Sequence, residues 1–429
     1  MKEEGHPKGL YLMFFVEMWE RFSYYGMRAL LVLYMTKYLL FSTAHASKVY
    51  GLYTGIVYMT PLIGGYLADR YIGARKSIII GAILMALGQF ALSTQAPSLF
   101  YIALGMLIIG NGFFKPNIST MVGQLYEKND PRRDGGFTIF YMGINLGALF
   151  SPLICGTLGE KVGWGYGFGA AGVGMVLGLM LYLWGQKRFL GEIGLHPVAV
   201  SSDPNDASNK PLTREEKEKI AVIFILAFFA VFFWAAFEQA GSSLTLFADQ
   251  ATDRRIPFTN WIFPASYFQA VNPLFIIMLA PLFSKMWISM AKKSIEPSTP
   301  HKFVCGLTLL GAGFVLMIFA AHAYQQTGPV SFLWLFGAYL LHTLGELCLS
   351  PVGLSLVTKL APAKFASLLM GTWFLSTAAA NVVGGMLAGN YDVMDKAVFF
   401  MIPTATAFGS AIVLLLLCKP LRKWMHGIN

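Results

Sequence analysis

Long apolar segments, separated by short polar ones, follow one another along the whole 429-residue chain. Most of them reach roughly 20 residues or more, the length that an α-helix needs to cross the hydrocarbon core of a bilayer. We count twelve, and the only long polar stretch lies between the sixth and the seventh. The predicted spans are 10–40, 48–69, 76–95, 99–124, 135–159, 165–187, 219–248, 259–286, 302–323, 330–359, 364–390 and 397–418.

This pattern predicts an all-α membrane protein with two groups of six helices. We expect an N-terminal six-helix bundle over residues 1–187, a cytoplasmic linker over 188–218 and a C-terminal six-helix bundle over 219–429. A composition of 56% hydrophobic and 13% charged residues excludes an ordinary soluble protein.

Lysine and arginine are distributed unequally between the two sides of the predicted spans. About 23 lie at the termini, in the linker and in the loops on that side, against about five in the other loops. Because cytoplasmic loops are enriched in basic residues, both termini and the linker are predicted to be cytoplasmic, in a multi-pass protein of the cell membrane. The same distribution explains the net charge of +10, so the charge does not indicate nucleic-acid binding.

The chain lacks the motifs of several other protein classes. Its four cysteines lie inside apolar segments without metal-ligand spacing, so we expect small core thiols, no disulfide and no metal. No phosphate-binding loop, zinc-protease motif or nucleophile elbow is present, which argues against nucleotide-driven transport and against an enzyme.

One stretch in the first span, residues 17–28, carries charges into the apolar interior. On a helix its polar side chains fall within an arc of about 140°. They are Glu17, Glu20, Arg21, Tyr24, Tyr25 and Arg28. Trp19 and Phe22 fall on the opposite side. A charge at mid-membrane costs roughly 2.5–3.5 kcal/mol, so the charged face is predicted to turn away from lipid. The alternative is a purely structural ion-paired seam, with Glu17 and Arg21 as an i,i+4 pair.

The predicted spans contain four acids and three bases away from their ends. The acids are Glu17, Glu20, Glu238 and Glu346, and the bases are Arg21, Arg28 and Lys115. One bound proton balances the set, so we predict a carboxylate that takes up and releases a proton, with Glu20 and Glu238 as candidates. The alternative is an odd charge that is solvated by water and never titrates.

The same inventory suits a zwitterionic ligand. Arg28 and Lys115 offer a basic pole and Glu346 an acidic one. Asn145 and Asn272 can hydrogen-bond amide or ammonium groups. Aromatic residues suited to side-chain pockets are Tyr24, Tyr25, Tyr58, Trp234 and Trp373.

Several motifs spread over nearly the whole chain carry a family resemblance. They cover residues 17–28 (E-x-x-E-R-F-x-Y-Y-G-M-R), 64–76, 112–119, 137–148, 233–243, 268–273 and 345–354. In these motifs the chain resembles the proton-coupled oligopeptide transporters, the POT or PTR family of the major facilitator superfamily. It departs from many bacterial members because it has no extra helix pair between the halves. It departs from animal members because Gly51 stands where they have a histidine.

The resemblance implies a monomeric symporter, without a cofactor, that imports di- and tripeptides with protons by alternating access. It implies proton coupling by Glu17, Glu20, Arg21 and Glu238. Salt bridges Arg28–Glu238 and Lys115–Glu346 are implied as the outer and inner gates. The implied substrate-binding residues are Arg28, Lys115, Asn145, Asn272, Glu346, Tyr25, Tyr58, Trp234 and Trp373.

Two other functions remain alternatives from the sequence. The first is a proton-coupled facilitator for another small solute such as nitrate, a drug or an amino-acid conjugate. Nitrate gives no role to Glu346, and a cationic drug gives none to three basic residues. The second is a membrane-embedded enzyme, for which no nucleophile–base set is found.

Overall fold

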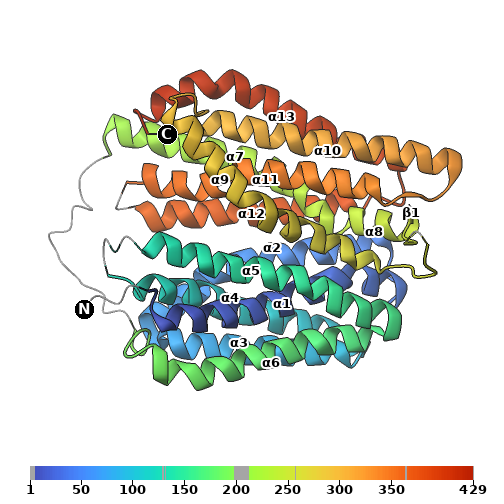
Figure 1. The fold of residues 1–429 in the computed structure, drawn as a ribbon, viewed down its shortest axis with the longest axis horizontal. Coiled ribbons are helices and arrows are strands. Elements are labelled where there is room, and N and C mark those ends of the chain that lie inside the picture. The colour runs from blue at the N-terminus through green and yellow to red at the C-terminus, as the bar shows by residue number, and fades with distance from the viewer. Residues whose placement is uncertain are drawn as a thin grey trace. The chain divides into compact units, whose positions relative to one another are not determined.

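Figure 1 shows the fold as a computed structural model, which describes residues 5–127, 130, 132–197, 212–256, 258–362 and 365–428. Within these residues thirteen α-helices account for most of the chain. They are α1 (Lys8–Lys37), α2 (Thr43–Leu67), α3 (Ala74–Ser93), α4 (Pro97–Gln124), α5 (Arg133–Thr157), α6 (Trp164–Phe189), α7 (Arg214–Phe237), α8 (Ser243–Gln250), α9 (Val271–Lys292), α10 (Thr299–Thr327), α11 (Leu333–Leu360), α12 (Ala366–Ala388) and α13 (Lys396–Trp424).

Short irregular segments extend several of these helices. The π-helical turns η1 (Ala68–Ile72) and η2 (Leu158–Val162) follow α2 and α5, and the 3-10 turns η4 (Glu238–Gly241) and η5 (Ala265–Ala270) precede α8 and α9. The strands β1 (Thr252–Asp253) and β2 (Val330–Ser331) pair in parallel and join two loops.

The number of membrane-length segments agrees with the sequence. Since α7, η4 and α8 continue one another, the described helices form twelve segments of membrane length. Among the described residues, nine spans are also apolar enough to cross a membrane, judged by length and composition alone. The predicted all-α fold is confirmed. Of the predicted linker, residues 198–211 lie outside the described part of the chain.

Two predicted spans are wrong in detail. The seventh was predicted to be continuous over 219–248, but the α-helix ends at Phe237 and a 3-10 turn follows, so Glu238 stands at a break. The eighth was predicted to start at 259, but helical structure begins at Ala265 and α9 at Val271. Aromatic and aliphatic residues of the preceding loop misled the prediction, because Trp261 and Ile262 are apolar yet exposed.

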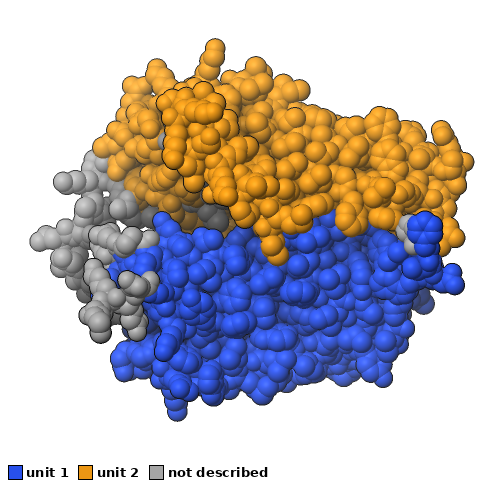
Figure 2. Space-filling model, viewed as in Figure 1, with its two compact units in different colours: residues 1–40, 56–201, 256–274 blue, residues 41–55, 202–255, 275–429 orange. Residues whose placement is uncertain are grey.

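The described chain forms two compact units, shown separately coloured in Figure 2. Unit 1 contains residues 1–40, 56–201 and 256–274, and unit 2 contains 41–55, 202–255 and 275–429. Each unit thus takes a short segment from the other half of the chain. The predicted domain boundaries at 187 and 219 stay a prediction.

In unit 1, α1 packs against α5 and α6, and α3 packs against α4 and α6 (Figure 1). Small residues on α5 allow the closest of these approaches. A Cβ atom built on Gly147 would lie 2.9 Å from the Cβ of Arg21 and from the amide nitrogen of Phe22, and one on Gly143 would lie 2.8 Å from the carbonyl oxygen of Phe14. Gly143 and Gly147 are four residues apart, the spacing with which small residues bring membrane helices together.

In unit 2, α10 packs against α11 and α13, and α7 packs against α12. The start of α7 has a capping box, in which Thr213 accepts a hydrogen bond from the backbone N–H of Glu216 (3.2 Å) and the Glu216 carboxylate accepts one from the N–H of Thr213 (2.8 Å). The Thr-Arg-Glu-Glu sequence predicts this start.

Candidate functional site

Three charged residues on the polar face of α1 are buried. Glu17, Glu20 and Arg21 expose 1%, 0% and 2% of their surfaces, although they lie in the middle of a 30-residue helix. Removing these charges from solvent is expensive unless they pair with one another. The structure therefore brings together the three residues that were predicted as one cluster.

Arg21 holds both carboxylates, but unequally. Its Nη2 donates to Oε1 of Glu20 at 2.7 Å and its Nε donates to Oε2 of the same carboxylate, which makes a two-point contact. Its Nε also lies 3.2 Å from Oε1 of Glu17, so the i,i+4 pair that was considered as a packing seam does form. The other oxygen of Glu17, Oε2, is buried and has no hydrogen-bond partner among the described residues.

Asn111 on α4 completes the cluster. Its side chain is 1% exposed, and its Nδ2 donates to Oε1 of Glu20 at 3.3 Å. Asn111 is not among the site residues predicted from the sequence. A signal was present, because Asn111 is a polar residue in an apolar span and lies one helical turn before Lys115.

Lys115 is half-buried on the same helix. Its ammonium interacts electrostatically with Glu17, Glu20, Arg21 and Arg28. It also lies 5.0 Å from the centre of the Tyr58 ring, within the range of a cation–π contact. Lys115 and Tyr58, predicted as substrate residues, are thus neighbours in unit 1.

Two further tyrosines accompany the basic groups of α1. The Arg28 guanidinium lies 5.7 Å from the ring centre of Tyr25, and that of Arg21 lies 5.2 Å from Tyr24. The two rings pack edge to face at 5.2 Å. Arg28 is 7% exposed, so it is a second basic side chain in the interior of this helix.

The two predicted asparagines have different surroundings. Asn145 on α5 is buried and donates to the backbone carbonyl of Tyr141 at 3.0 Å, one turn earlier. Asn272 is the second residue of α9 and is half-buried. Both belong to unit 1.

Unit 2 contains the remaining predicted residues. Glu238 is 6% exposed and stands where the α-helix α7 ends and the 3-10 turn η4 begins. Trp234, one turn earlier, packs edge to face on Phe237 at 5.3 Å. On α11, Glu346 is half-buried, and Trp373 of α12 is 5% exposed and contacts Phe303.

The predicted gate pairs combine residues of different units. Arg28 and Lys115 belong to unit 1, whereas Glu238 and Glu346 belong to unit 2. The two gate salt bridges therefore stay predictions.

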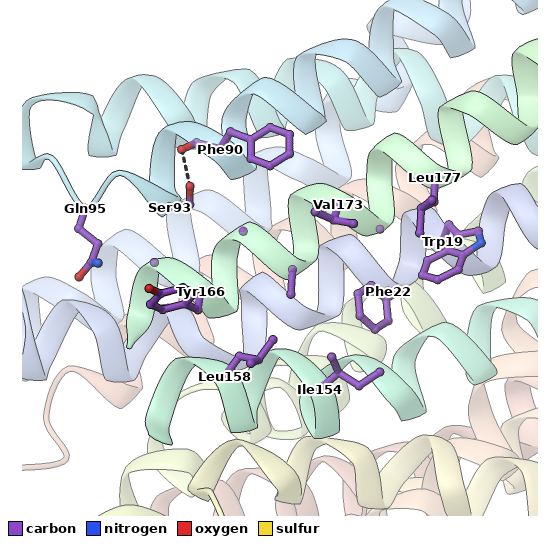
Figure 3. A pocket seen from close by; sticks show the side chains of 14 residues that line it. Trp19, Phe22, Phe90, Ser93, Gln95, Ile154, Leu158, Tyr166, Val173 and Leu177 are labelled. Atoms are coloured by element: carbon purple, nitrogen blue, oxygen red, sulfur yellow. Dashed lines mark hydrogen bonds between the residues drawn. The ribbon is translucent and has the colours of Figure 1, made fainter. Parts of the chain in front are cut away.

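A groove of about 850 Å³ opens on the opposite side of α1 (Figure 3). Trp19 and Phe22 line it together with apolar and small residues of α3, α5 and α6, and Ser93 and Gln95 lie at one end. It contains no charged side chain. The prediction that α1 has a charged face and an apolar face is confirmed.

The described residues contain no group of three His, Cys, Asp or Glu side chains that could hold a metal ion. The four cysteines are free thiols. The buried cluster offers carboxylates and a guanidinium, with the Lys115 ammonium nearby, and these groups can exchange partners or bind a proton.

Twelve helical segments of membrane length, with charged side chains buried in the interior of the first, are typical of a multi-pass membrane transporter. The sequence profile described as the POT family matches residues 75–196 and 198–406. The chain is 37% identical to the peptide transporter YePEPT of Yersinia enterocolitica, over 99% of this chain and 96% of that protein. It is 34% identical to a di-/tripeptide transporter of Lactococcus lactis subsp. cremoris, over 99% and 98%.

A solved structure of a POT family transporter in complex with 5-aminolevulinic acid matches the fold with a TM-score of 0.90. The sequences are 32% identical, with 98% of each chain covered. The chain belongs to the POT family.

Proposed function

We propose that this protein imports di- and tripeptides across the cell membrane together with protons, as a monomer, with both termini in the cytoplasm. Family membership and the peptide transporters among its relatives support the substrate class. The observation that carries the proposal is the buried cluster of Glu17, Glu20 and Arg21, because ionisable groups in a membrane interior mark ion and substrate pathways.

Protons are the proposed coupling ion. The cluster on α1 has two carboxylates on one guanidinium, and Lys115 interacts with all three. A proton on one carboxylate would weaken its pairing with Arg21 and change the balance of charge around Lys115. Glu238, at the break in the seventh span, is the second proposed proton site.

A peptide's charged ends match the proposed binding residues. We assign its carboxylate to Arg28 and Lys115 and its ammonium to Glu346, with help from Asn145 and Asn272. Four aromatic residues of the transporter would contact the side chains of the peptide. They are Tyr25, Tyr58, Trp234 and Trp373. The peptide carboxylate would compete with Glu238 for Arg28. It would also compete with Glu346 for Lys115. These competitions would couple peptide binding to alternating access.

A second candidate substrate class is a non-peptide amino acid. A POT transporter similar to this chain has been solved with 5-aminolevulinic acid, which carries one amine and one carboxylate. The same charged residues can hold such a ligand, so the test must compare the two.

The test is uptake of labelled dialanine into liposomes that contain the purified protein, with and without an inward proton gradient. We expect accumulation that requires the gradient and is inhibited by unlabelled di- and tripeptides. Glu238→Gln should abolish gradient-driven accumulation, whereas Glu215→Gln, a change of a solvent-exposed carboxylate in the first turn of α7, should not.

Dialanine that neither enters the liposomes nor competes would overturn the peptide assignment. Inhibition by 5-aminolevulinic acid alone would favour the second class. Recovery of free alanine in place of intact dialanine would indicate an enzyme.

A further inference from the structure

Asn111 contributes a hydrogen bond to the buried cluster of Glu17, Glu20 and Arg21. Its Nδ2 donates to Glu20 from a different helix, at 3.3 Å. Its Oδ1 is buried and accepts no hydrogen bond within the described part of the chain. Among the described residues, the side chain of Asn111 therefore makes its hydrogen bond to Glu20 alone.

The hydrogen bonds to the two carboxylates are unequal because of Asn111 and the orientation of Arg21. Glu20 accepts from three donors: Nε and Nη2 of Arg21 and Nδ2 of Asn111. Glu17 has one oxygen 3.2 Å from Nε of Arg21, and its other oxygen is without a donor. A carboxylate with three donors keeps its charge more readily than one with an unsatisfied buried oxygen.

We propose that Asn111 is a positioning residue that keeps Glu20 ionised and bound to Arg21, so that Glu17 becomes the carboxylate that exchanges Arg21 for a proton. This inference rests on the proposed proton-coupled transport. In the described part of the chain, the charged and titratable groups around the pair are Arg21, Tyr24 and Tyr25 of α1 and Lys115 of α4.

Without the amide donor the ionised form of Glu20 is less stable, so the pair of carboxylates takes up a proton at higher pH. Asn111→Ala should move the midpoint of proton-driven uptake upward by about 1–2 pH units, the equivalent of one hydrogen bond to a charged group. Asn111→Ser should do the same, because its hydroxyl is too short to reach Glu20. Asn111→Asp should shift the midpoint further, since it replaces a donor by a second negative charge.

Asn117→Ala is the matched control. Asn117 lies on the same helix and is 2% exposed, but its amide donates to the backbone carbonyl of Phe113 at 2.7 Å. Its removal should leave the pH midpoint unchanged. Size-exclusion chromatography of each purified variant reports folding, and either Ala or Ser at position 111 suffices for the measurement.

Two transport assays in liposomes separate this role from a structural one. Counterflow of labelled dialanine, without a pH gradient, should keep its KM within about twofold of the wild type, because Asn111 is not placed against the peptide. Gradient-driven uptake, measured over a series of external pH values, should show the upward shift.

Wild-type protein that fails in counterflow would refute the proposed function itself. Wild-type protein that transports, with Asn111→Ala and Asn111→Ser giving its unshifted pH profile, would overturn the role of Asn111. An equal shift in Asn117→Ala would also overturn it, because the effect would then belong to helix packing.

Discussion

Glu20 and Glu17 are adjacent on one helix face and chemically alike, but the structure predicts different consequences when each is changed to glutamine. Glu20→Gln removes the charge that Arg21 contacts at two points. Breaking a buried ion pair by deleting one partner typically costs 3–5 kcal/mol. Glu17 remains 3.2 Å from Nε of Arg21 and partly compensates, so we expect the lower end, about 3 kcal/mol.

Glu17→Gln removes a single ion-pair contact and replaces an oxygen that has no donor by an amide nitrogen. The expected loss is about 1 kcal/mol, because Arg21 keeps its two-point contact with Glu20. The difference of about 2 kcal/mol corresponds to a melting temperature lower by about 2 °C in the Glu20 variant, because the unfolding entropy of a chain of this length is about 0.9 kcal/mol/K.

Thermal unfolding of the purified variants in detergent at neutral pH measures this difference. Glu192→Gln, a change at an exposed carboxylate after α6, is the control and should match the wild type. Equal melting temperatures for the two variants, or a less stable Glu17 variant, would show that Arg21 is not held mainly by Glu20.

Three further predictions test other parts of the structure. Gly147→Ala should prevent close packing of α1 on α5 and sharply reduce the yield of folded protein. Gly105→Ala, where an added Cβ meets nothing within 4 Å, should be well tolerated. Size-exclusion chromatography of both variants measures the yield of folded protein. Glu160→Ala removes an acceptor for the backbone N–H groups of η5, two bonds of 2.9 Å each, and should lower stability by about 1–3 kcal/mol, measured by thermal unfolding against Glu160→Gln. Hydrogen bonds from the Arg255 side chain and backbone lower the pKa of Asp253 to about 2, so the stabilisation is complete at neutral pH and is lost as the pH falls from about 4 through about 2. Arg255 is exposed and Asp253 half-buried, so Arg255→Ala should lower the stability only slightly at pH 7 and still less at pH 3, in the same assay.

The apolar pattern predicted nearly all of the helices to within a few residues. For example, the predicted spans 135–159 and 165–187 correspond to α5 (Arg133–Thr157) and α6 (Trp164–Phe189). The prediction succeeds because a bilayer requires about 20 apolar residues in a row whatever the neighbouring helices are. It failed at η4 because the hydropathy of the seventh span does not change where the helix breaks. The Gly-Ser-Ser sequence after Ala240 was the local signal for that break.

The candidate site was predictable in part. Glu17, Glu20 and Arg21 share a helix face by their spacing, and the structure buries all three. Asn111 was missed because its contact with Glu20 joins residues 91 positions apart.

By itself the sequence determined that the chain has membrane-spanning segments, where most of its helices begin and end to within a few residues, and that charged side chains lie inside them. Those properties follow from hydropathy and helical spacing, which are local. The tertiary structure alone decided that Arg21 contacts Glu20 at two points and Glu17 at one, and that the Asn111 amide from α4 donates to Glu20. These contacts depend on the depth and rotation at which α1 packs against its neighbours, and that geometry is set by residues far apart in the chain.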